Sequence, residues 1–103
     1  MTTQEIRIVL HAPTPGGLDR ARRNLGNVLQ AMPSATVRIL VNGDGVAAAL
    51  DSPDPTADAS TLVCPTTLKR IGRSAEAPLT VLEVPGVVAL ANLQIEGWQY
   101  IRP

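Results

Sequence analysis

The fold is decided by the stretch Thr61-Leu62-Val63-Cys64-Pro65-Thr66-Thr67-Leu68-Lys69-Arg70, where a short apolar run passes directly into a helix-start signal. Proline is common at the first helical position, because the N–H group that it lacks would be unpaired there. The stretch therefore predicts a strand over residues 61–64, a helix over residues 65–71, and Cys64 at the helix N-cap. Gly72 is the predicted C-terminal stop of that helix.

The rest of the chain repeats this alternation of strand and helix signals. Such alternation is typical of right-handed βαβ units around a mostly parallel sheet. We therefore expect an α/β fold, a three-layer αβα sandwich of about five strands, with residues 1–103 forming a single domain. Residues 51–59 are expected to be a polar, proline-bearing connection. The expected strands lie at residues 6–10, 37–41, 61–64, 79–84 and 98–101, and the expected helices at residues 18–32, 46–50, 65–71 and 87–96.

The composition is that of a folded domain with an aliphatic core. Apolar residues make up 45% of the chain and charged residues 17%, which argues against disorder. The chain has no phenylalanine, so the core must be built from Val, Leu, Ile and Ala, as in sheets buried on both faces. The formal net charge is zero, which argues against a nucleic-acid partner and permits self-association.

No targeting or membrane segment is evident. Residues 1–5 lack the basic and apolar regions of a signal peptide, and no uninterrupted apolar run approaches the roughly 18 residues of a membrane span. The chain has one cysteine, which cannot form an internal disulfide. A reducing compartment is the simplest setting for such a chain, so we expect a cytoplasmic protein without a membrane partner.

The sequence places the candidate site at the carboxyl ends of the strands, where ligands bind in open parallel sheets. Cys64 is the candidate reactive residue, because a helix N-terminus favours an anion and lowers a thiol's pKa. The alternative is that Cys64 is a buried small hydrophobic residue, since free cysteine is often buried. The residues expected to form a pocket around it are His11, Asn42, Gly43, Pro65, Thr66, Thr67 and Gly86.

Three further features leave alternatives open. His11 is the only histidine, so it forms no metal cluster with Cys64; it polarises the thiol if its strand neighbours the Cys64 strand, or it caps a loop. The glycines around Asp44 lack the third glycine of a dinucleotide fingerprint, which favours a tight turn. Trp98 and Tyr100 alternate along the last strand, so both rings share one face, either as core or as oligomer contacts.

The chain resembles the DsrE/DsrF-like family, which includes YchN-type proteins and the sulfur-relay carriers. The resemblance runs through residues 6–11, 18–33, 37–45 and 64–72. It is most specific in the ending, which runs from Gly86-Val87-Val88-Ala89-Leu90 through Leu93-Gln94-Ile95-Glu96-Gly97-Trp98-Gln99-Tyr100-Ile101-Arg102-Pro103. Where relatives tend to have cysteine-glycine-asparagine-threonine, this chain has Cys64-Pro65-Thr66-Thr67, and its segment 46–59 is shorter.

The resemblance implies a homo-oligomer, commonly a dimer, trimer or hexamer, that carries sulfane sulfur as a persulfide on the cysteine matching Cys64. It implies a sulfurtransferase-like carrier with protein donors and acceptors of sulfur, and no metal or other cofactor. The alternative is a non-catalytic ligand-binding or assembly module of the same fold, in which Cys64 is structural.

Overall fold

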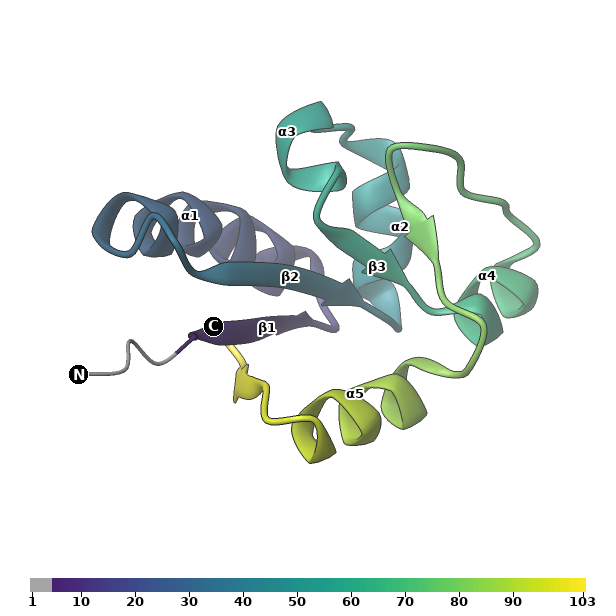
Figure 1. Ribbon diagram of the computed structural model, residues 1–103. Helices are drawn as coiled ribbons and strands as arrows, with labels where there is room; N and C mark the ends of the chain where they lie inside the picture. The colour runs from purple at the N-terminus through teal and green to yellow at the C-terminus, as the bar shows by residue number, and fades with distance from the viewer. Residues whose placement is uncertain (1–4) are drawn as a thin grey trace.

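The computed structural model describes residues 5–103 and forms one five-stranded sheet in the order β4-β3-β2-β1-β5 (Figure 1). All four pairings are parallel, which confirms the predicted α/β fold. The first four residues, on which much of the expectation of no signal peptide rests, lie outside the described part. The strands are β1 (Arg7–Ala12), β2 (Thr36–Val41), β3 (Thr61–Val63), β4 (Thr80–Val81) and β5 (Gln99–Ile101).

Helices lie on both faces of the sheet and make the three predicted layers. Figure 1 shows α1, α2 and α3 on one side of the sheet and α5 alone on the other. Within residues 5–103, no helix has the length and hydropathy that a membrane crossing requires. The helices are α1 (Pro15–Ala31), α2 (Asp44–Asp51), α3 (Pro55–Asp58), α4 (Pro65–Ile71) and α5 (Gly86–Ile95).

The short helix α3 lies within residues 51–59, for which the sequence predicts only a polar, proline-bearing connection. Asp54 caps this helix, its side chain accepting a hydrogen bond from the Ala57 N–H at 3.2 Å, and Pro55 occupies the first turn. An aspartate followed by proline is a recognised helix start, because it satisfies one exposed donor and removes another. The polar composition of the segment concealed that signal.

Aliphatic side chains fill both sides of the sheet, as the composition predicted. Successive residues of a strand point to opposite faces. Leu10 therefore packs with the helices α1 and α2, whereas Val9 packs with Leu40 and with Ala89 and Leu90 of α5. The layer on the α5 side is the thinner one, since a single ten-residue helix covers it.

The fourth strand is shorter than the predicted residues 79–84. Only Thr80–Val81 pairs as a strand, at the exposed edge beside β3. Leu82 donates one further backbone hydrogen bond, to the carbonyl of Val63, and then Leu82 and Val84 pack under α5. The apolar run in this segment therefore reflects packing against α5 more than pairing in the sheet.

The parallel register brings three predicted site residues to one edge and one face. His11 lies on β1 two residues after Val9, so it shares the face on which α5 packs. Asn42 and Cys64 directly follow the paired residues Val41 and Val63 of neighbouring strands. Gly86, the first residue of α5, lies close to both of them.

Candidate functional site

Cys64 occupies the N-cap of α4, as the sequence predicted. Its backbone is extended, with φ −67° and ψ 120°, and Pro65 lies in the first turn of the helix. Gly72 ends the helix in the left-handed conformation with φ +68°, which also confirms the predicted stop. The cysteine is buried, with 5% of its surface exposed.

The sulfur of Cys64 accepts one hydrogen bond and lies near further donors. The backbone N–H of Gly86 donates to Sγ at 3.2 Å. Burial alone would raise the pKa of the Cys64 thiol, but the backbone N–H and hydroxyl of Thr67 and the N–H groups of Gly86 and Thr66 together hold this pKa below its usual value. Because Cys64 forms no side-chain capping hydrogen bond in α4, the two threonine amides act on the sulfur mainly as nearby dipoles.

Position 86 favours a glycine because the backbone closely approaches the sheet there. A Cβ atom there would lie 3.3 Å from the Cys64 Cβ and from Leu40 Cδ2, and 3.4 Å from the Asn42 Cβ. Such contacts are tighter than packed side chains normally accept. The absence of a side chain on Gly86 thus allows its N–H group to reach the sulfur.

Thr67 connects α4 to the turn after β2. Its hydroxyl oxygen accepts a hydrogen bond from the Gly43 N–H at 3.2 Å, and only 6% of the residue is exposed. Gly43 has φ +50°, a conformation that favours glycine. Two predicted site residues therefore form one partly buried contact, and the hydroxyl of Thr67 links this turn to the thiol.

His11 bridges two polar side chains and makes no hydrogen bond to Cys64. Its Nε2 lies 2.8 Å from Asn42 Oδ1, and its Nδ1 lies 2.6 Å from the Tyr100 hydroxyl. With Oδ1 as the acceptor, Nε2 donates, and in the neutral ring the tyrosine hydroxyl donates to Nδ1. The strand β2 separates β1 from β3, so the condition under which His11 would polarise the thiol is not met.

The two aromatic residues of the last segment have different surroundings. Trp98 is half-buried in the layer under α5, and the Arg7 guanidinium lies 5.7 Å from the centroid of its ring. Tyr100 is 39% exposed on the edge strand β5 and hydrogen-bonded to His11. Trp98 is thus core, while Tyr100 joins the polar residues at the strand ends, a role that the sequence analysis missed.

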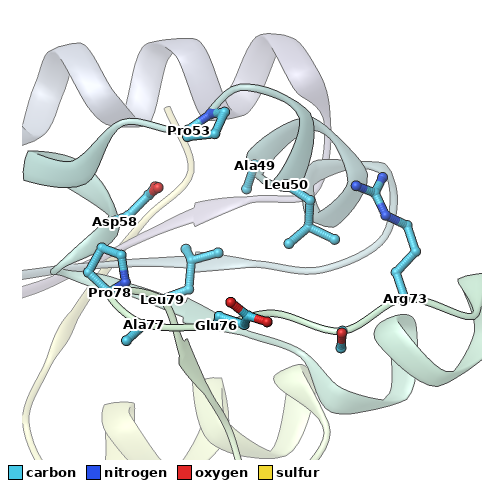
Figure 2. Close-up of a pocket in the computed structure, with 10 residues that line it drawn as sticks. Ala49, Leu50, Pro53, Asp58, Arg73, Glu76, Ala77, Pro78 and Leu79 are labelled. Carbon is cyan, nitrogen blue, oxygen red and sulfur yellow. The ribbon is translucent and has the colours of Figure 1, made fainter.

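The predicted pocket residues pack against one another rather than around an open cavity. Three surface pockets of the described chain have other linings. One of about 320 Å³ lies between α2, α3 and residues 73–79, with Asp58 and Arg73 toward opposite ends (Figure 2). Asp58 is buried and bonded to Arg22 at 3.2 Å, and Arg73 pairs with Asp51 at 2.9 Å. No sequence signal identified this pocket, because its lining joins residues from separate elements.

Within residues 5–103 no three histidine, cysteine, aspartate or glutamate side chains come together as metal ligands. The chemistry that the arrangement does present is that of a single thiol with amide donors near its sulfur. Comparison with known proteins adds no relative: no protein-family model matches the chain, and a search of curated proteins found no significant match.

Proposed function

We propose that this protein carries sulfane sulfur as a persulfide on Cys64, as the sulfur-relay members of the DsrE/DsrF-like family do. One observation carries the proposal: the Cys64 sulfur accepts the Gly86 N–H, and the donors around it lower the pKa of the thiol. A lower pKa increases the thiolate fraction at neutral pH, and the thiolate is the form that attacks sulfur.

The reaction requires no oxidant. The Cys64 thiolate attacks the terminal sulfur of a donor persulfide, a new S–S bond forms, and the donor's own S–S bond breaks. The donor thiolate leaves with the electron pair of that bond. An acceptor thiolate then removes the sulfur from Cys64 by the same exchange, so the carrier returns unchanged.

The amide donors also suit the product. A persulfide on Cys64 would ionise and place its negative charge one atom farther from Cβ. The N–H of Gly86 donates to Sγ and the N–H groups of Thr66 and Thr67 lie near it, so these donors would stabilise the neighbouring persulfide anion. Because Cys64 is only 5% exposed and the Gly86 N–H contacts its sulfur, access of the donor would require Gly86 to move.

The proposal includes the cellular setting that the resemblance implies. The protein would act in the cytoplasm as a homo-oligomer and exchange sulfur with donor and acceptor proteins. It would use no metal or other cofactor, since the thiol itself bonds the cargo.

Persulfide loading tests the proposal directly. The reduced protein is incubated with a small-molecule persulfide donor and its intact mass is measured. We expect a gain of one sulfur atom per chain, removed by a reductant and absent in Cys64→Ser. A wild-type chain that gains no sulfur under conditions that load a known persulfide carrier would contradict the proposal.

The burial of Cys64 favours a second candidate, a binding or assembly module of the same fold. In that case the thiol fills space between Gly86 and the sheet, and its hydrogen bond to the Gly86 N–H serves stability alone. The two candidates differ in thiol reactivity. A carrier has a thiol that reacts readily near neutral pH, whereas a structural cysteine reacts slowly at every pH at which the protein stays folded.

A further inference from the structure

The outer face of α5 is apolar and exposed. Val87, Val88 and Ile95 have 68%, 41% and 84% of their surfaces exposed. With the exposed Ala91 they lie within one narrow arc of the helix, opposite the buried Ala89 and Leu90. Only Asn92 and Gln94 are polar among the residues of α5, and a helix that is apolar over most of its circumference is normally buried. In the described chain, no other element packs on this arc.

Tyr100 extends the apolar area toward the edge of the sheet. It pairs with Val9 in the register of β1 and β5, so its ring lies on the same side of the sheet as α5, and 39% of it is exposed. We call Val87, Val88, Ala91, Ile95 and Tyr100 the α5 surface. Two elements that are consecutive in the chain thus contribute to one side of the molecule (Figure 1).

The area of the α5 surface suits a dimer contact. Since a large apolar side chain has an area of about 150–250 Å², its four large residues expose on the order of 400 Å². A standard interface takes about 800 Å² from each subunit, of which roughly 450–500 Å² is apolar. The α5 surface supplies most of that apolar share.

The absence of charge on α5 suits a second copy of this chain as the partner. No ionisable residue occurs from position 84 to position 95, and the whole chain has no net charge. In a two-fold interface each surface meets itself, so any charge would face a like charge. A helix that lies on a membrane carries Lys or Arg on its polar face, and α5 has neither.

We propose that the α5 surface is the two-fold interface of a homodimer. Val87, Ala91 and Ile95 form one ridge at four-residue spacing, with the small residue in the middle. Two such ridges pack by crossing at their alanines, so that Val87 of one copy lies beside the large side chains of the other. The proposal gives the homo-oligomer of the proposed function an interface, and it does not depend on sulfur chemistry at Cys64.

Sedimentation velocity over a range of micromolar concentrations tests the interface. We expect the wild-type chain to form a dimer. The dissociation constant of the dimer should be at least about tenfold higher for the double variant Val87→Glu/Ile95→Glu than for the wild type. The matched control is Leu29→Glu/Val81→Glu, which adds the same charge at two sites that are each 39% exposed outside the α5 surface, and it should leave the dimer intact. Far-ultraviolet circular dichroism verifies that each variant is folded.

Cross-linking supplies an independent readout. In a Cys64→Ser background, Ala91→Cys should form a disulfide with its own copy, whereas Gly26→Cys on α1 should not. A wild-type monomer, a trimer, or a dimer that is equally stable in Val87→Glu/Ile95→Glu would overturn the proposal. Because persulfide loading of Cys64 is measured on the wild-type chain, each proposal can fail without the other.

Discussion

At the scale of single residues, the reactivity of Cys64 depends on a few neighbouring donors. Thr67 contributes both its backbone N–H and its hydroxyl to lowering the pKa of the thiol. Thr66 contributes its backbone N–H, and its side chain is exposed. The two adjacent threonines therefore provide a matched pair for testing the hydroxyl.

We expect the rate of Cys64 alkylation to rise with pH around a midpoint below the ~8.5 of free cysteine. Thr67→Val should raise that midpoint, because it removes a donor to the sulfur, while Thr66→Val should leave it unchanged. Stopped-flow alkylation over a pH series measures both. A midpoint at or above that of free cysteine would favour the structural role of the thiol.

The same pKa shift makes stability depend on pH. The folded-state pKa lies below the unfolded value, so the folded state binds the proton less tightly. The contribution of Cys64 to the free energy of unfolding is therefore fully present above the unfolded-state pKa, and it is lost as the pH falls through the folded-state pKa. Cys64→Ser should remove this dependence.

Gly86 is the second residue on which the site depends. Gly86→Ala adds a Cβ within 3.3 Å of the Cys64 Cβ, and we expect a loss of about 1 kcal/mol in the free energy of unfolding, since overpacking outweighs the gain in helix propensity. The control is Gly26→Ala on α1, where a Cβ meets no atom within 4 Å, and a gain of about 0.5–1 kcal/mol is expected. Urea denaturation measures both; equal effects would contradict the packing argument.

At the scale of elements, local sequence signals predicted where most helices begin and end. They predicted few of the contacts between elements. Pro65 and Gly72 mark the bounds of α4 by backbone preferences that act within a few residues. The same kind of signal occurs at Asp54 and Pro55, within a segment whose polar composition also fits an irregular connection. The contact between His11 and Tyr100 depends on β5 lying beside β1, and strand order is a property of the whole sheet.

The link between α1 and α3 is a buried ion pair whose worth can be measured. The side chains of Arg22 and Asp58 are 14% and 5% exposed, and Arg22 Nε is buried without a hydrogen-bond partner. Asp58→Asn would leave the arginine charge uncompensated, and we expect a loss of about 3–5 kcal/mol in the free energy of unfolding. Asp51→Asn, which breaks the exposed pair with Arg73, should cost less than about 1 kcal/mol. Thermal or urea unfolding compares the two, and similar losses would refute the role of burial.

At the scale of the whole molecule, the two faces of the sheet are covered unequally. The helices α1, α2, α3 and α4 contribute to the core on one face, whereas α5 alone covers the other face and leaves an apolar outer surface exposed. The alternation of strands and helices predicted the three layers, because the spacing of apolar residues in each element can be seen in the sequence. The exposed side of α5 and the position of Tyr100 on the same side of the sheet could not be predicted without the strand order.

The pairing of β5 with β1 also has a consequence for the order in which the molecule opens. His11 and Tyr100 are 89 positions apart, so their contact closes a far longer loop than the contacts among β1, β2 and β3. Loop closure of that length costs entropy, and α5 fully buries few side chains in return. We expect α5 and β5 to detach as one cooperative unit before the rest of the sheet unfolds. Since Gly86 belongs to that unit, such partial unfolding would uncover the Cys64 sulfur while β1, β2 and β3 stay folded.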